Sequence, residues 1–308
     1  MPAATTHPLR GMLCGLLAAI LFGASVPACK AWAKDCDPLM SAALLYAGSG
    51  LGLGLVFVLR GLFSRRWGIG VARKDWPLLS LSMAVGGWVA PVALMWGLLH
   101  TSGSAGSLLG NVELVFTALL AWAFFREKIS GWAAAGLGLV AIGGVALALG
   151  GASDDNAPAQ STTLGLLAVT LAYLAWSLDN NLTRKLSAND PLVLAGLRGL
   201  AAGAANLLLA MGLRHQPLPE TAILLKLLAT GALGYGGSLA LLVLTMRSLG
   251  AARAGAVFGL APFFGTALSV AVLKEAFSPL MGVAAGCMAL GVAALGWEGL
   301  RGERKNAE

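Results

Sequence analysis

Long apolar runs separated by short polar segments fill the chain from residue 11 to residue 299. A helix that crosses a membrane needs roughly 20 mostly apolar residues, and each run is about this long. The pattern predicts ten transmembrane helices, at residues 11–31, 38–59, 77–99, 103–125, 131–150, 164–182, 191–213, 226–247, 254–273 and 279–299.

The chain also contains a duplication. The segment 124–147 returns 148 positions later, with Glu127 matching Glu275 and Ser130 matching Ser278. A second match, Gly15 to Ala18 against Gly165 to Ala168, marks the start of each copy. Because each copy holds an odd number of spans, the two copies lie in the bilayer with opposite orientations, as in many secondary transporters.

These boundaries predict an all-α polytopic membrane protein of two inverted five-helix repeats. We expect a first repeat at 1–150, a second at 164–301 and a cytoplasmic tail at 302–308. The segment 151–163, which is acidic, polar and interrupted by Pro158, reads as a flexible periplasmic linker between them.

Composition agrees with a membrane protein. Hydrophobic residues make up 57% of the chain, charged residues 11%, and the mean hydropathy is +0.79, whereas about 25% of residues are charged in a soluble domain. Of the 21 Lys and Arg residues, 15 fall on one side of the predicted spans, 5 on the other, and Arg198 lies within a span. Since basic loops stay in the cytoplasm, this predicts a multi-pass protein of the bacterial inner membrane with both termini cytoplasmic.

Three ionisable side chains lie inside the predicted spans, where each costs roughly 2.5–3.5 kcal/mol. Glu113 is about ten residues into the fourth span, on a narrow face of small residues that includes Thr117. One interpretation is a protonated carboxyl that is hydrogen-bonded across a helix contact. The other is a proton or cation site facing a cavity, with Asn111 nearby on another helical face.

The other two, Asp179 and Arg198, enter the membrane from the same side and have similar depth. An ion pair between them is the structural interpretation. The functional one places Asp179 and Asn180 at the inner mouth of a pathway, with Trp176 one turn earlier and Arg198 as a gate or anion-binding group.

Weaker signals come from glycine and proline positions in the third, eighth and ninth spans. Gly86-Gly87-Trp88 matches Gly234-Tyr235-Gly236 at the 148-residue offset, and Pro262-Phe263 interrupts the ninth span. Bending points of this kind form carrier sites, although plain helix packing explains them equally. On this basis Trp88, Tyr235 and Phe263 join the candidate pathway residues.

No metal or cofactor site is expected. The three histidines lie outside the spans or at their ends, and the four cysteines lack ligand-like spacing. Cys29 and Cys36 are able to pair on the outer side, but buried free thiols are the favoured interpretation. Paired acids, a nucleophile with its base and a phosphate-binding loop are all missing from the sequence, so we do not expect an enzyme.

Several of these features resemble the EamA-type permeases of the drug/metabolite transporter superfamily. The resemblance rests on two five-helix copies, on Arg126-Glu127 echoed by Lys274-Glu275, on Asp190-Pro191 followed by Arg198, and on the runs 111–120 and 179–185. It implies a basket of helices around a central cavity, with the fifth and tenth helices peripheral. It also implies export of small organic metabolites or drugs across the inner membrane. The chain departs from repeat symmetry where Leu45 stands at the position of Arg198.

The sequence thus predicts a secondary transporter that works by alternating access, with proton or cation coupling left open. Export is the leading interpretation, uptake of a small nutrient the alternative, and a non-transporting sensor or assembly protein the candidate from another class. The expected partners are a small-molecule substrate and membrane lipid but no nucleic acid, because the net charge of +7 follows from topology. A homodimer stays open.

Overall fold

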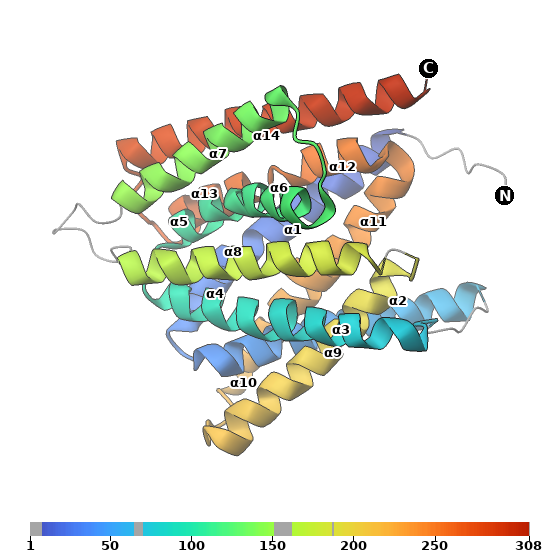
Figure 1. Cartoon of the computed structure of the whole chain (residues 1–308). Coiled ribbons are helices and arrows are strands. Elements are labelled where there is room, and N and C mark those ends of the chain that lie inside the picture. The colour runs from blue at the N-terminus through green and yellow to red at the C-terminus, as the bar shows by residue number, and fades with distance from the viewer. Residues whose placement is uncertain (1–7, 65–69, 151–161, 187, 308) are drawn as a thin grey trace.

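The computed structural model describes residues 8–64, 70–150, 162–186 and 188–307, and within these ranges the chain is helical and contains no strand. Each of the ten predicted spans corresponds to a helix or to a run of joined helical segments (Figure 1). In the first half they are α1 (Pro8–Ala33), α2 (Pro38–Ser64), the joined segments η1 (Arg73–Asp75), α3 (Trp76–Ser82), η2 (Met83–Val89) and α4 (Ala90–Leu99), then α5 (Gly103–Leu108), η3 (Leu109–Asn111) and α6 (Val112–Phe125), and finally α7 (Gly131–Gly150).

The second half follows the same order. Its spans are α8 (Thr163–Arg184), then α9 (Pro191–Leu208) with η4 (Leu209–Leu213), then α10 (Thr221–Thr230), η5 (Gly231–Gly237) and α11 (Ser238–Leu249), then α12 (Ala251–Phe258) and α13 (Ala261–Val272), and finally α14 (Pro279–Ala307). Helix α14 therefore continues through most of the segment that we expected to be a cytoplasmic tail.

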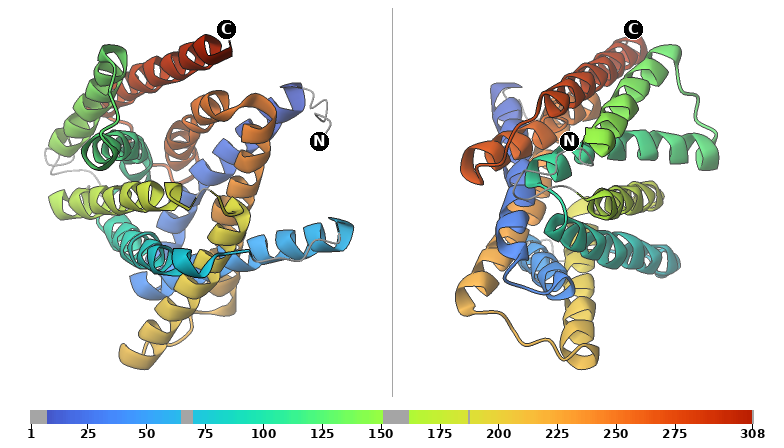
Figure 2. Two further views of the ribbon diagram at one scale, coloured as in Figure 1. Left: turned by 45° about the vertical axis from the view of Figure 1, so that its right-hand side comes forward. Right: turned by 90° about the vertical axis from the view of Figure 1, so that its left-hand side faces the viewer.

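Helix α8 is the most polar span. Within the described residues, nine helices are long and apolar enough to cross a membrane, and α8 completes the set of ten. Its polar groups Ser177, Asp179 and Asn181 are buried, because α8 packs against α4, α6 and η2. Figure 2 shows α8 lying between α4 and the span of α5 and α6. A polar face is tolerated there because protein, not lipid, surrounds it.

The two halves pack through matching pairs. Helix α2 crosses α9, and α7 crosses α14 along one edge of the molecule (Figure 1). This confirms that the fifth and tenth spans are peripheral. Glycines permit the close approach of α2 and α9, since a Cβ atom on Gly199 would lie 2.6 Å from the backbone nitrogen of Gly50.

The glycine pairs in the third and eighth spans mark a real irregularity. Segments η2 and η5 are π-helical, and they occupy equivalent positions in the two repeats. In each repeat this segment packs against the first span of the other repeat, η2 on α8 and η5 on α1. Turns of π-helix interrupt the regular backbone pairing of an α-helix and are frequent at functional sites.

We name the two ends of the bundle after their α6–α7 and α13–α14 loops. The Glu127 end carries loop 126–130, and the Glu275 end carries loop 274–278. Thr162, near the end of the expected linker, lies at the Glu275 end. The linker residues 151–161 fall outside the described part, but Thr162 caps α8 and bonds through its backbone N–H and its hydroxyl to the carbonyl oxygen of His100, at 2.9 and 3.1 Å.

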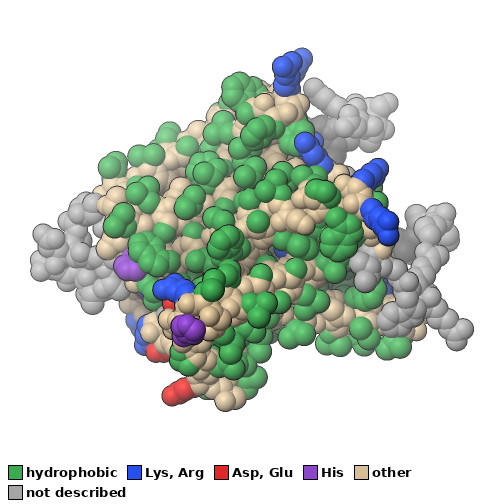
Figure 3. Space-filling model, turned by 60° about the horizontal axis from the view of Figure 1, so that its bottom comes forward, with side chains coloured by type: hydrophobic (Ala, Val, Ile, Leu, Met, Phe, Trp, Pro, Cys, Tyr) green, Lys and Arg blue, Asp and Glu red, His purple; other side chains and the backbone are tan. Residues whose placement is uncertain are grey.

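Hydrophobic side chains cover the outer surface between the two ends. Figure 3 shows a face on which charged groups gather at opposite edges and hydrophobic groups fill the area between them. Large residues such as Leu62, Leu171 and Leu290 are exposed on this belt. All four cysteines are free thiols, but only Cys29 is buried and the other three are half-buried, whereas the sequence favoured buried thiols.

Candidate functional site

A cavity opens between the two repeats. It consists of two adjoining pockets that share Phe22 of α1, Glu113 of α6, Leu242 of α11 and Phe258 of α12. The larger pocket has a volume of about 340 Å³, which lies at the lower end of the ~300–1,000 Å³ usual for small-molecule sites.

Glu113 lies where two helical segments meet. The fourth span changes to the 3₁₀ segment η3 at 109–111 and resumes as α6, with Glu113 in its first turn. The side-chain amide of Asn180 donates a hydrogen bond to the Glu113 carboxylate at 2.7 Å, and the Ser177 hydroxyl donates to its carbonyl oxygen at 3.0 Å. The predicted small-residue face of this span thus packs on α8 and also borders the cavity, and no Lys, Arg or His of the described residues forms an ion pair with Glu113.

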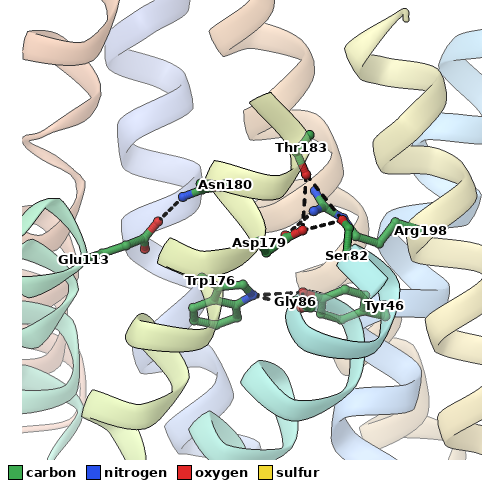
Figure 4. Close-up of polar contacts among 9 residues, drawn as sticks. All are labelled: Tyr46, Ser82, Gly86, Glu113, Trp176, Asp179, Asn180, Thr183 and Arg198. Atoms are coloured by element: carbon green, nitrogen blue, oxygen red, sulfur yellow. Dashed lines mark hydrogen bonds and ion pairs between the residues drawn. The ribbon is translucent and has the colours of Figure 1, made fainter. Parts of the chain in front are cut away.

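A second polar cluster surrounds Asp179, the residue that precedes Asn180 in α8 (Figure 4). Its carboxylate forms an ion pair with Arg198 of α9, which confirms the predicted pairing. It also accepts hydrogen bonds from the hydroxyls of Ser82 in α3 and Thr183, the latter at 3.2 Å. Both side chains line the larger pocket, and Arg198, at 20% exposed, is more accessible than Asp179, at 3%.

Aromatic side chains form one wall. The indole N–H of Trp176 donates to the Gly86 carbonyl oxygen at 3.0 Å and to the Tyr46 hydroxyl at 3.1 Å, and Tyr46 also donates to Gly86 (Figure 4). The Gly86 carbonyl belongs to the π-helical segment η2, whose irregular backbone presents it to these side chains. The ring of Tyr235 lies within 6.4 Å of the rings of Tyr46, Trp176 and Phe22, centroid to centroid.

The charges of the cavity do not balance. Asp179 and Arg198 neutralise one another, whereas Glu113 has only the neutral Asn180 as a side-chain partner among the contacts described. When Glu113 is ionised, the cavity therefore carries one net negative charge beside aromatic rings. An arrangement of this kind attracts a proton or a positively charged group.

The predicted site residues fall into two groups. The structure brings Glu113, Trp176, Asp179, Asn180, Arg198 and Tyr235 together around the larger pocket, and Asn111 lines the smaller one. Asn111 turns toward α14, where its side chain lies 3.8 Å from the sulfur of Met288. Thr117 contributes its carbonyl oxygen to Asn181 at 3.2 Å and does not line either pocket.

Two predicted pathway residues lie elsewhere. Trp88 is 47% exposed on the outer surface, because Gly86 and Gly87 occupy the buried face of η2 and successive helical residues point in different directions. Phe263 lines a separate shallow pocket beside Leu108 and packs on the hydrophobic core. For these two side chains, the glycine and proline positions predicted a helix irregularity but did not predict whether the side chain faces the cavity.

Sequence reasoning missed four residues that line the site or contact it. Tyr46 is one of only three tyrosines in the chain, and a phenol inside a predicted span was a usable signal. Phe22, Ser82 and Phe258 resemble ordinary membrane-helix residues, and nothing in the sequence separates them from lipid-facing ones. Within the described residues no cluster of three or more His, Cys, Asp or Glu side chains is placed to hold a metal ion.

Comparison with known proteins agrees with this architecture. The model of the EamA-like transporter family matches residues 9–149 and again residues 163–297. An uncharacterized transporter from Methanothermobacter thermautotrophicus is 29% identical over 230 residues, which cover 74% of this chain and 67% of the relative. A solved crystal structure shares the fold, with a TM-score of 0.66 over 94% of this chain and 98% of the other at 18% identity.

The family match covers both five-helix halves, and the curated relative is itself a transporter. The chain is a multi-pass membrane transporter and belongs to the EamA-like transporter family.

Proposed function

We propose that this protein is a secondary transporter that exports a small organic solute across the bacterial inner membrane by alternating access. The observation that carries this proposal is Glu113, a carboxylate without a cationic partner among the described residues, at the junction of two pockets between the repeats. A buried charge is costly in the membrane, so its position in an accessible cavity favours a role in binding.

The walls of the cavity indicate what kind of solute fits. Aromatic rings from α1, α2, α8 and η5 supply apolar surface, while Glu113 supplies the unbalanced charge. A solute with an apolar body and a basic nitrogen satisfies both. Because the same carboxylate binds either a proton or the basic group, exchange between the two couples solute movement to protons.

The distribution of basic residues supports the orientation. Arg126, Lys128, Arg184, Arg247 and Arg253 all lie at the Glu127 end, and basic loops favour the cytoplasm. The smaller pocket extends from mid-bundle toward this end, where Met246 and Gly255 line it. A cavity that opens to the cytoplasm collects its solute there, which favours export.

The proposal is tested with purified protein in two stages. A thermal-shift screen of small organic amines and amino acids first identifies a solute that stabilises the folded state. Solute counterflow into proteoliposomes is then measured between pH 6 and 8 for the wild type and Glu113→Gln, with Glu220→Gln at the start of α10 as the matched control.

The Gln side chain keeps the volume and the hydrogen bond to Asn180 but does not titrate. We expect Glu113→Gln to fold and insert normally and to lose the pH dependence of transport, while Glu220→Gln behaves as wild type. An unchanged rate and pH profile in Glu113→Gln would mean that Glu113 only joins α6 to α8.

A further inference from the structure

The duplication allows each contact in one half to be compared with its counterpart in the other. Loops 126–130 and 274–278 have the same backbone shape, since Arg126 and Lys274 both adopt the left-handed conformation with φ of 54° and 57°. Ser130 and Ser278 then cap α7 and α14 in the same way, each accepting a backbone N–H at 3.1 Å. Glu127 and Glu275 therefore leave equivalent points of equivalent loops.

The two carboxylates have different partners. Glu275 crosses to the other repeat and accepts the backbone N–H groups of Gly103 at 2.7 Å and Ser104 at 2.8 Å, at the start of α5. At the 148-residue offset, the counterparts of Gly103 and Ser104 are residues 251 and 252, at the start of α12. Glu127 pairs with Arg184 of α8, and its side chain is 42% exposed.

Helix packing follows the same difference. At the Glu275 end, α5 packs along α13, so closely that a Cβ atom on Gly265 would lie 2.6 Å from the Ser107 hydroxyl oxygen. The counterparts of these two residues are Thr117 and Gly255. A Cβ atom on Gly255 would meet nothing within 4 Å, and among the described residues α6 and α12 share no comparable packing. The bundle is closed at the Glu275 end and open at the Glu127 end.

The start of α12 also lacks a local cap. Helix α5 is preceded by Ser102, whose hydroxyl accepts the N–H of Ala105 at 3.1 Å. Helix α12 is preceded at the equivalent position by Gly250, which has no side chain to cap it. The first N–H groups of a helix have no partner within the helix, and a carboxylate is a strong acceptor for them.

We propose that Glu275 and Glu127 are positioning residues that alternately hold the two ends of the transporter shut. In the state described here Glu275 holds α5 and α13 together. In the opposite state Glu275 releases α5, and Glu127 leaves Arg184 and accepts the N–H groups of residues 251 and 252, which brings Gly255 against Thr117. This assignment rests on the proposed alternating-access function.

The test measures conformation and needs no solute. In a variant with Cys14, Cys29, Cys36 and Cys287 replaced by serine, Gly255→Cys reports the opening at the Glu127 end and Ser107→Cys the opening at the Glu275 end. The rate of reaction of each with a water-soluble maleimide is measured in detergent, alone and combined with Glu275→Gln, Glu127→Gln, Arg184→Gln or the control Glu220→Gln.

Weakening one charge-assisted hydrogen-bond pair shifts a two-state equilibrium by about tenfold. We expect Glu275→Gln to slow labelling at 255 and speed labelling at 107 by up to this factor. Arg184→Gln, which frees Glu127, should act in the same direction, and Glu127→Gln in the opposite one.

Opposite changes at the two probes support the proposal. Equal rates in all variants, or faster labelling at both probes as general loosening would give, overturn it. If the probes respond as expected and no solute moves in proteoliposomes, the positioning role stands and the proposed transport function fails. If solute moves and the probes do not respond, the proposed transport function stands and the positioning role fails.

Discussion

Helices α6 and α13 are counterparts in the duplication, yet they place different groups at the same depth of the membrane. Helix α6 carries Glu113 at the edge of the cavity. Helix α13 has Ala261 at the equivalent position, where its backbone meets α1 so closely that a Cβ atom on Gly23 would lie 2.3 Å from the Ala261 carbonyl oxygen. Ala261 is 1% exposed although it lines the smaller pocket, whereas Glu113 is half-buried, so the asymmetry of charge accompanies an asymmetry of packing.

Helices α2 and α9 differ in a similar way. Aligned on their first residues, Pro38 and Pro191, they place Leu45 and Arg198 at the same position. Leu45 of α2 lies where η5 approaches the α2 backbone, since a Cβ atom on Gly231 would be 1.9 Å from the Leu45 carbonyl oxygen. Its counterpart Arg198 lies beside η2, where Gly87 faces the small side chain of Ala202 and leaves room for the guanidinium group near Asp179. The two repeats share a backbone plan, and one of them keeps space for a charged pair.

The largest effect is expected when Arg198 is made like its counterpart. Arg198→Leu leaves Asp179 charged, almost fully buried and without its cationic partner, which should destabilise the folded protein by about 3–5 kcal/mol. Asp179→Asn should cost less, because Arg198 reaches the cavity and its water. Unfolding in detergent measures both changes.

The double variant Arg198→Leu with Asp179→Asn provides the control, and it should recover much of the loss of the single Arg198 variant. Additive losses in the double variant would mean that the two side chains act independently and that the ion pair contributes little.

A smaller effect is expected at the π-helical segments. Gly86→Ala places a methyl group 2.2 Å from the Asp179 carboxylate, whereas Gly234→Ala at the equivalent position places one 2.7 Å from the Cβ of Ser25. Overpacking typically costs about 1–3 kcal/mol. Gly86→Ala should approach the upper value because it also displaces an ion pair, and Gly234→Ala should stay nearer the lower one.

Gly138→Ala is the matched control for these two variants, because its Cβ atom would meet nothing within 4 Å. It should be neutral or slightly stabilising, as alanine is in an open helical position. Equal losses from Gly86→Ala and Gly234→Ala would show that the cost comes from the π-helical backbone and not from the contact with Asp179.

Most of the fold was predictable from the sequence because each span is a recognisable apolar run and because the repeat provided a second estimate of every boundary. Asp179 and Arg198 were predictable as partners because two opposite charges at one depth have few other options. The cavity wall was less accessible to sequence reasoning. Phe22 and Phe258 are indistinguishable from lipid-facing residues by type, and the position of Trp88 depends on which face of η2 its neighbouring glycines occupy.

The smallest expected effect concerns loop 126–130 at the open end. The hydrogen bond from Arg184 holds the pKa of the Glu127 carboxyl below its usual value, which is about 4.3 in an unfolded chain. A lowered carboxyl pKa contributes stability that is fully present above the unfolded value and is lost as the pH falls through the folded one. The thermal stabilities of wild type and Glu127→Gln should therefore differ by a constant amount between pH 6 and 8 and converge in acid.

Because both partners are largely exposed to solvent, this difference should be below about 1 kcal/mol and should shrink further at high salt. Thermal unfolding of both proteins at pH 7, 5 and 3 measures this difference. Each measurement is repeated with roughly 1 M salt, which screens the two charges. A difference that widens on acidification would contradict the ion pair. The alternating role proposed for Glu127 also requires that its contact with Arg184 is weak. Glu127 has to exchange Arg184 for the start of α12 in each transport cycle, and a strong ion pair would keep the Glu127 end open.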